Sequence, residues 1–281
     1  MTTFVEPAVA EQSEAEALFR FQTGAPDSVR TALGMSAARI GGGVVLSMTD
    51  DVTRFWSKAL GFGVSTPVTA DVIREVCDFY RAAGTPQAVL QIAPAFLPED
   101  WADICEREGI TASDSSWVKL VCPVEEAVAR ADAPGRSPDG ILVAPVAAEQ
   151  ADVWGEVMMT AFGMPVEPFA RMAAGSAGQS GWHPYAAWLE GELVGTGTMY
   201  VRGETAQFFA GAVLPHARAR GGQSALLAAR ARRAQELGCR TLVAETGVET
   251  PGTHNSSLHN MFRLGFAPAY ERRNWSWQPA A

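Results

Sequence analysis

Apolar positions recur at helical spacing in several parts of the chain. The side chains of Val72, Val76 and Tyr80 fall on one face of such a helix. Thr69 precedes this helix, and Gly84 provides a suitable C-terminal stop. The same spacing predicts further helices, which span residues 98–108, 149–162, 165–174, 224–237 and 256–264. Residues 1–35 are predicted to be a partly ordered lead-in with one helical stretch over 15–23.

Short runs of apolar and β-branched residues between these helices predict strands. They span residues 44–48, 88–92, 117–122, 141–146, 185–189, 193–201, 207–214, 241–246 and 269–277. Glu190-Gly191-Glu192 marks a tight hairpin, while residues 54–61 are predicted to form a helical turn or loop. This alternation of strands and helices predicts a mixed α/β fold in layers.

The length of 281 residues predicts two domains. Residues 123–140 are rich in Pro, Ala, Asp and Gly, and their second half is the strongest linker candidate. We therefore predict one domain over residues 1–135 and a second over 136–281.

The charge is unevenly spread. Residues 1–140 hold 20 acidic and 11 basic side chains, so they carry the whole net charge of −9. This acidity argues against a nucleic-acid partner. The N-terminus lacks the pattern of a signal peptide, and no apolar stretch is long enough to span a membrane. The four cysteines form no CxxC pair and lie far from the histidines, so we expect no metal site. From the N-terminus and the lack of a spanning stretch, we expect a cytoplasmic protein without a membrane partner. The oligomeric state stays open.

The segment from Val213 to Ser224 is the most informative part of the sequence. It places a strand end, a Pro turn, Arg218, Arg220 and the pair Gly221-Gly222 directly before a long helix. The two glycines allow the backbone to turn its N–H groups into one concavity, which the positive end of the helix also faces. A pyrophosphate group would fit such a site. An ordinary strand–turn–helix with solvated arginines is the alternative.

These residues resemble the GNAT superfamily of acyl-CoA-dependent N-acyltransferases. Its phosphate loop reads [QR]-x-x-G-x-[GA], and Arg218 and Gly221 match the first two marked positions, whereas Gln223 departs from the third. The flanking family features are matched by Val213-Leu214-Pro215 and Leu264-Gly265-Phe266. The first half is similar to the later part of the same fold but lacks the loop. The resemblance thus implies a tandem GNAT protein with a degenerate N-terminal copy.

The resemblance implies acetyl-CoA as co-substrate, with its pyrophosphate on residues 220–225 and its pantetheine arm between the strands around 207–214 and 241–246. The cofactor-binding residues that it implies are Gly211, Ala212, Val213, Arg218, Arg220, Gly221, Gly222, Gln223, Ser224, Ala225, Asn255 and Asn260. For Asn255 and Asn260, a helix-capping role is an equal alternative to a contact with CoA. The backbone N–H of Ala212 or Val213 is the implied oxyanion donor.

Glu245 is the first candidate for the base that accepts the amine proton, because a carboxylate at the end of a buried strand can have a raised pKa. Its alternative role is a salt bridge to a nearby arginine. His254 and His259 are alternative bases, and His183 is a weaker one.

The usual acid of the family, a Tyr, is replaced by Met261, which leaves Tyr270, Ser257 or water to protonate the thiolate. We expect Trp154, Phe162, Trp182 and Tyr185 to wall the acceptor pocket. The predicted function is acetyl transfer from acetyl-CoA to a small-molecule amine or an amino terminus. A non-catalytic acyl-CoA-binding or scaffold protein is the alternative.

Overall fold

The computed structural model describes residues 6–133 and 140–279. All described strands join one 11-stranded sheet, whose order is β1-β2-β3-β4-β11-β5-β10-β9-β8-β7-β6. The strands are β1 (Met35–Ile40), β2 (Gly43–Met48), β3 (Lys58–Leu60), β4 (Ala88–Gln91), β5 (Ile110–Pro123), β6 (Ile141–Pro145), β7 (Tyr185–Leu189), β8 (Glu192–Arg202), β9 (Thr205–Val213), β10 (Thr241–Gly247) and β11 (Ala267–Trp277). The α-helices are α1 (Pro7–Thr23), α2 (Asp27–Ala32), α3 (Ala70–Ala83), α4 (Trp101–Glu108), α5 (Val124–Ala131), α6 (Ala151–Phe162), α7 (Phe169–Ala174), α8 (Gly222–Glu236) and α9 (Ser256–Leu264).

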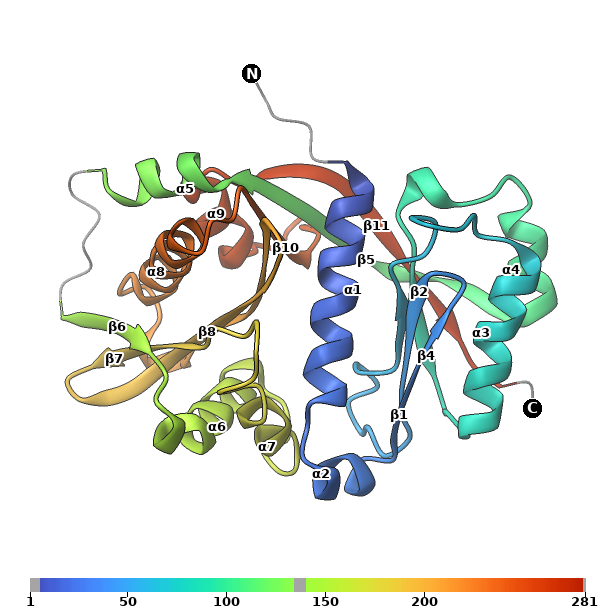
Figure 1. Ribbon diagram of the computed structural model, residues 1–281, viewed down its shortest axis with the longest axis horizontal. Coiled ribbons are helices and arrows are strands. Elements are labelled where there is room, and N and C mark those ends of the chain that lie inside the picture. Colours follow the sequence, from blue (N-terminus) through green and yellow to red (C-terminus); the bar gives the residue numbers. More distant parts are fainter. Residues whose placement is uncertain (1–5, 134–139, 280–281) are drawn as a thin grey trace.

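The two halves of the chain repeat one topology and exchange a strand. In each half one neighbouring pair is parallel, β3 with β4 and β9 with β10, while the other pairs in the sheet are antiparallel. The last strand of the first half, β5, pairs with β10 of the second half. The last strand of the second half, β11, pairs with β4 of the first half. Figure 1 shows β5 and β11 crossing together from one half to the other. The predicted boundary at 135/136 lies outside the described residues and stays a prediction.

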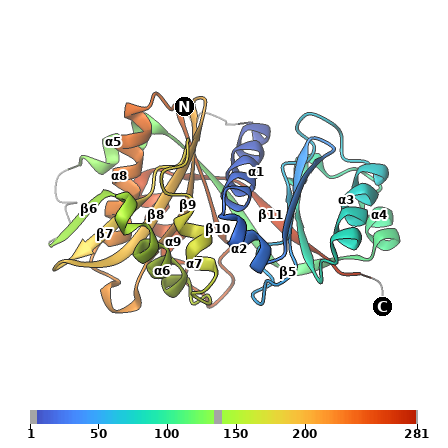
Figure 2. The ribbon, with the colours of Figure 1, turned by 60° about the horizontal axis from the view of Figure 1, so that its bottom comes forward.

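Helix α1 stands between the halves, as Figures 1 and 2 show from two sides. Its apolar residues Leu18 and Phe21 share one core with Leu46 of β2, Trp182 and Met172 of α7. The same helix carries the buried carboxylates Glu11 and Glu14 toward the middle of the sheet. The N-terminal segment is therefore a central helix, and the prediction of a partly ordered lead-in is wrong for the described residues.

Local signals placed several elements correctly. Helix α3 begins after Thr69, whose Oγ1 accepts a hydrogen bond from the backbone N–H of Val72 (3.3 Å), and ends at Gly84 in the left-handed conformation. Glu190 and Gly191 both have positive φ, as a two-residue hairpin between β7 and β8 requires. Helix α9 has the predicted bounds.

Two strands were not predicted from the sequence. Residues 54–61, expected to be a helical turn or loop, contain β3, and residues 35–40 form β1. Strand β3 has three residues, too few to show a period, and the edge strand β1, MSAARI, does not alternate apolar and polar positions. Among the described residues, no helix combines the length and the apolar character that spanning a bilayer requires.

Candidate functional site

Strands β9 and β10 separate partway along their length. Their parallel pairing covers three residue pairs and ends at Gln207 and Val243, although β9 continues to Val213 and β10 to Gly247. A bulge bends β9 where Thr196 and Thr198 of β8 shift register, and Ala210 at this bulge has a φ of 52°. The structure thus contains a split where the sequence predicted one.

Arg230 of α8 stabilises this bulge from the face of the sheet that α8 covers. Its guanidinium is buried and donates to the carbonyl oxygens of Thr198 (2.9 Å) and Phe209 (3.3 Å). Burial lowers the pKa of Arg230 to about 9, which leaves it charged at neutral pH. Sequence analysis missed this role, although Arg230 lies on the apolar face of the predicted helix with Leu227, Ala231 and Ala234.

The backbone of Val213 faces the split. The N–H of Leu214 donates to the Val194 carbonyl (2.8 Å), and Gly195 is the Cα partner of Val213. Because backbone groups alternate along an antiparallel strand, the Val213 N–H and C=O point away from β8. Arg218 Nε donates a hydrogen bond to the Val213 carbonyl oxygen (3.1 Å). The Val213 N–H is therefore directed toward the edge at which β10 has departed.

Helix α8 begins without a cap. Gly221 precedes it with a φ of 83°, and no side chain caps its first turn. The first helical bond runs from Ala225 N–H to Gly221 O (2.9 Å), so the helix provides no acceptor for the N–H groups of Gly222, Gln223 and Ser224. These groups and the positive end of a 15-residue helix form an anion-binding concavity, which we call the α8 cradle (residues 218–224).

The first half offers an internal comparison. Its helix α3 connects the two strands of the parallel pair β3 and β4, as α8 connects β9 and β10, but the Thr69 hydroxyl caps it. In α3 the cap therefore occupies the Val72 N–H, whereas no side chain caps the first turn of α8. This difference is consistent with a first copy that lacks the phosphate loop.

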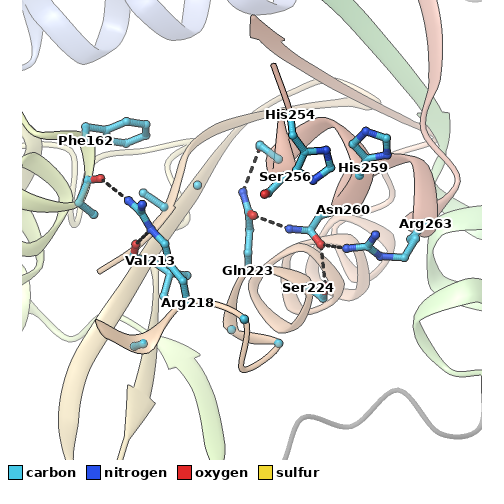
Figure 3. Close-up of a pocket in the computed structure, with 18 residues that line it drawn as sticks. Phe162, Val213, Arg218, Gln223, Ser224, His254, Ser256, His259, Asn260 and Arg263 are labelled. Carbon is cyan, nitrogen blue, oxygen red and sulfur yellow. Dashed lines mark hydrogen bonds between the residues drawn. The ribbon is translucent and has the colours of Figure 1, made fainter. Parts of the chain in front are cut away.

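Two cavities flank the cradle. The outer cavity, of about 670 Å³, lies between β9, α8 and α9 (Figure 3). It is lined by most of the predicted cofactor residues: Gly211, Ala212, Val213, Arg218, Gly221, Gly222, Gln223, Ser224 and Asn260. A neighbouring cavity of about 560 Å³ beside α8 adds Arg220 and Ala225. The structure thus brings together the predicted cofactor residues apart from Asn255.

Asn255 is a cap. Its Oδ1 accepts from the Leu258 N–H (3.1 Å) at the start of α9, and its Nδ2 donates to Thr246 Oγ1 (2.9 Å) and to the Gly247 carbonyl (2.8 Å). It lines neither cavity, so the prediction of a cofactor contact is not met by this side chain.

Gln223 connects the two helices that bound the outer cavity. Its Nε2 donates to Ser257 Oγ (3.0 Å), and its Oε1 accepts from Asn260 Nδ2. Asn260 Oδ1 in turn accepts from Ser224 Oγ (3.3 Å) and from Arg263. Figure 3 shows this network between α8 and α9. The side chain that departs from the family loop is therefore held against α9.

An inner cavity of about 270 Å³ lies deeper in the split, where both halves meet. Its walls are mainly aromatic and methionine side chains, and the first half supplies Phe55, Trp56 and Trp117. The inner and outer cavities share four lining residues: Phe162, Gly211, Gln223 and Ser257. These four residues form the boundary between the two cavities, which we call the passage.

The predicted acceptor walls need correction. Phe162 lines both cavities, but Trp154, Trp182 and Tyr185 line neither. Trp154 is fully buried and donates to the Tyr185 carbonyl (2.9 Å), while Trp182 packs in the core beside Phe21. Aromatic residues at these positions stabilise the core of the second half, and the first half replaces them as cavity walls.

Glu245 of β10 lines the inner cavity at the edge of a buried charge cluster. Its Oε2 accepts from Arg272 Nη2 of β11 (2.8 Å) and from Lys119 Nζ of β5 (3.2 Å). Both cations also contact Glu14 of α1, and Arg272 pairs with Glu11 (2.8 Å). The predicted salt bridge and the predicted buried carboxylate are therefore both present in this residue.

The cluster sets the ionisation of its carboxyl groups. Burial and the neighbouring charge of Glu14 raise the pKa of Glu245 to about 7, against the pull of Lys119 and Arg272. Burial opposes the ionisation of Glu14 as well, but Arg272 and Lys119 outweigh it and hold the pKa of Glu14 well below its usual range. Two close carboxylates cannot both be charged at low cost, so the proton resides on the one that faces the cavity.

Tyr270 belongs to this cluster and not to the cavities. Its hydroxyl donates to Glu11 Oε1 (2.6 Å), and burial together with the Glu11 charge raises the pKa of Tyr270. It lines neither the outer nor the inner cavity, so its prediction as the acid is wrong. Ser257 and Met261 do line the inner cavity.

The histidines lie apart from Glu245. His254 and His259 line the outer cavity, and their rings stack at a centroid distance of 4.6 Å. Glu249 accepts from the Asn255 N–H and lies 3.0 Å from His259 Nε2. Within the described ranges, Glu249, His254 and His259 are the one group of three or more potential metal ligands whose ligating atoms lie within 4.8 Å of one another. His183 lines neither cavity, and burial lowers its pKa.

Residues 156–266 match the Acetyltransferase (GNAT) family. The matched range begins within α6 and ends just before β11, so it contains the split, the α8 cradle and α9. A search of curated protein sequences found no significant match.

Solved structures resemble the whole chain. A GCN5-related N-acetyltransferase from Kribbella flavida has a TM-score of 0.65 at 15% identity, covering 98% of this chain and 96% of that chain. A GCN5-related N-acetyltransferase from Sphaerobacter thermophilus has a TM-score of 0.59 at 16% identity, covering 98% and 93%. A tandem GNAT protein from the clavulanic acid biosynthesis pathway has a TM-score of 0.57 at 14% identity, covering 98% of each chain.

At these identities the likeness concerns the fold. It extends over both halves, which confirms the mixed α/β fold and its two tandem GNAT-like units. With the family match in the second half, these findings confirm the resemblance seen in the sequence: residues 156–266 match the GNAT family, and the whole chain has the fold of tandem GNAT proteins.

Proposed function

We propose that the chain transfers an acetyl group from acetyl-CoA to a primary amine. Its family and fold support acyl transfer in general. The proposal of acetyl-CoA and an amine rests on the arrangement of the cavities. The uncapped N-terminus of α8 lines the outer cavity, and this cavity adjoins the inner cavity, which Glu245 lines.

The residues of the cradle fit the pyrophosphate of CoA. The N–H groups of Gly222, Gln223 and Ser224 would bind its oxygens, and Arg220 adds positive charge beside them. Arg218 acts differently from the prediction. Its guanidinium donates to the carbonyls of Val213 (3.1 Å) and Ala161 (3.3 Å), so it fixes β9 against α6.

The reaction joins the amine nitrogen to the thioester carbonyl carbon and breaks the carbon–sulfur bond. The Val213 N–H would stabilise the oxyanion, and Glu245 would accept the proton that the amine nitrogen loses. A base with a pKa of about 7 is well matched to this task near neutral pH. The released thiolate, with an ordinary pKa of ~8.5, takes a proton from water or from Ser257, because Met261 supplies none.

The test begins with binding and continues with turnover. Acetyl-CoA should raise the thermal midpoint of the protein, and thiol release should then follow over a panel of amines. Glu245→Gln should lower kcat by roughly tenfold to a thousandfold. The matched control is Glu249→Gln on the loop after the same strand, which should leave kcat within about twofold, since Glu249 lines neither cavity. Unchanged turnover in Glu245→Gln would contradict the assignment of the base.

Two observations favour a second candidate, a non-catalytic acyl-CoA-binding protein. The Gln223–Ser257 hydrogen bond crosses the passage between the cavities, and the usual acid is replaced by Met261. A thermal shift with acetyl-CoA without thiol release from any amine would favour this candidate. No shift with acetyl-CoA would contradict both.

A further inference from the structure

Lys58 is a buried cation without an acceptor. Four cationic side chains are buried in the described part of the chain, and three of them donate to carboxylates or carbonyls. Lys58 of β3 is 3% exposed, and within the described residues its ammonium makes no hydrogen bond or ion pair. It lies over the rings of Phe55 (3.9 Å to the centroid) and Trp117 (5.5 Å). Aromatic faces attract the charge, but they leave the three N–H donors of the ammonium unused.

This ammonium faces a cavity of about 610 Å³ over the first-half sheet, which we call the first-half groove. The floor of the groove is polar across adjacent strands. Gln91 Nε2 donates to Asn274 Oδ1 (2.8 Å), and Asn274 Nδ2 donates to Ser115 Oγ (2.8 Å). Gln91 Oε1 is buried and has no hydrogen-bond partner. The groove is thus lined by a buried lysine that pairs with no carboxylate among the described residues and by one buried acceptor without a partner, as in a polar ligand site.

The sign of the buried charge defines the ligand. Arg54, Asp114 and Glu271 also line the groove, but they are exposed and screened by water. Lys58 is the one charged residue among the lining residues that is buried, so its field acts with little screening. An anionic acceptor group, such as a carboxylate, would satisfy its donors.

The groove adjoins the inner cavity. Phe55, Trp117 and Gly247 line both, so the two aromatic rings that contact Lys58 are also walls of the cavity that contains Glu245. A molecule whose amine lies at Glu245 can therefore extend past an apolar wall toward a cation. Burial lowers the pKa of Lys58, the charges of Glu245 and Glu14 oppose this, and those of Arg272 and Lys119 reinforce it.

We propose that the first-half groove binds a carboxylate of the acyl acceptor, so that the acceptor is an amino acid-like molecule in which an apolar spacer joins a primary amine to a carboxylate. This proposal rests on the proposed function, because it extends the same acceptor site. It gives the first half, which lacks a CoA loop, the task of selecting the acceptor.

The test uses thiol release with acetyl-CoA and matched pairs of amines. The carboxylates 4-aminobutanoate, 6-aminohexanoate and 8-aminooctanoate are each compared with their carboxamides. The best carboxylate should exceed its carboxamide in kcat/KM by at least about tenfold, the scale of a buried charge pair. Lys58→Met should remove this advantage through KM and leave the carboxamide unchanged.

The control is Arg54→Met, which removes a positive charge from the exposed rim of the same groove and should change the ratio by less than about twofold. Lys58→Gln serves as a second variant, and the thermal midpoint of each variant reports its folding. Equal efficiencies for carboxylates and carboxamides would overturn the proposal. An equal loss for both members of a pair in Lys58→Met, or the same loss in Arg54→Met, would overturn it too.

A binding measurement separates this proposal from the proposed function. Calorimetric titration of 6-aminohexanoate and 6-aminohexanamide into the full chain requires no turnover. If no amine is acetylated, the proposed function fails. Carboxylate-selective binding that Lys58→Met abolishes would still support the groove as a carboxylate site, whereas equal or absent binding of both compounds would overturn it.

Discussion

Glu14 and Glu245 share two cations, and replacement of Glu14 should change the pH dependence of acetyl transfer. Lys119 and Arg272 each contact both carboxylates, and Glu14 carries the negative charge that disfavours a second one on Glu245. Glu14→Gln preserves the size of the side chain and removes this charge. The pKa of Glu245 should then fall, because the same two cations face one carboxylate fewer.

The size of the effect follows from the shift. The pKa of Glu245 rises from 4.5 to about 7, which corresponds to roughly 3 kcal/mol at ~1.36 kcal/mol per pKa unit. Burial is the largest cause and Glu14 the next, so Glu14→Gln should lower this pKa by about one unit and leave the remainder. A base must be ionised to act. At pH 6 the wild type should therefore keep roughly a tenth of its maximal rate, and the variant about half.

The assay is the pH profile of kcat, measured by thiol release with the amine that the wild type acetylates best. Using one amine for both proteins cancels the ionisation of the acceptor itself. Glu16→Gln is the matched control on the same helix, because Glu16 also pairs with two arginines, Arg20 (2.8 Å) and Arg39 (2.6 Å), away from the cavities. Its profile should match the wild type. An unmoved midpoint in Glu14→Gln, with the fold intact by circular dichroism, would refute the coupling of the two carboxylates.

Three further predictions concern the cradle, the passage and stability. Gly221→Ala should weaken acetyl-CoA binding by at least about tenfold in calorimetry, since φ is 83° there; Gly203→Ala, at a φ of 56° in a hairpin, should not, and equal losses would contradict a cradle at Gly221. Gln223→Ala should tighten acetyl-CoA binding by about two- to tenfold, because the wild type must first break the hydrogen bond between Gln223 and Ser257 to open the passage. Weaker binding would show instead that Gln223 contributes to the site. Glu245→Gln should raise the thermal midpoint at pH 8, where the wild-type carboxylate is charged at a cost, but have little effect at about pH 4, below the pKa of this group in both the unfolded and the folded state; the opposite order would contradict the raised pKa.

The sequence predicted what local signals encode. Helix α3 has a hydroxyl cap and a glycine stop, and the hairpin at Glu190-Gly191 needs only two residues in the left-handed region. The cradle was equally local, because Gly221 and the following helix are contiguous. A three-residue strand such as β3 has no period, and its pairing with β4 depends on residues about thirty positions away.

The charge cluster lay beyond local reasoning. Glu14, Lys119 and Arg272 are more than 100 residues apart in pairs, and only the strand exchange brings them to Glu245. One signal was available: Glu11, Glu14, Leu18 and Phe21 repeat at spacings of three and four, which places two carboxylates on the apolar face of a helix. Acidic side chains in such a stripe are rarely buried without partners, so they indicate buried cations elsewhere.

The strand exchange also explains why a first half without a CoA loop is part of the site. In the exchanged arrangement β5 brings Lys119 to β10, while β11 carries Arg272 along β5 to the same point. Helix α1 then covers these cations with Glu14, and the loop before β3 adds Phe55 to the cavity wall. The second half alone would therefore lack Lys119 and the charge of Glu14 that raises the pKa of Glu245. The absence of the phosphate-loop motif from the first half removes none of these contributions, because none of them depends on such a loop. The two halves are thus unequal in sequence but jointly form one site, in which, under the proposed function, the second half would bind the donor and the first half would tune the base.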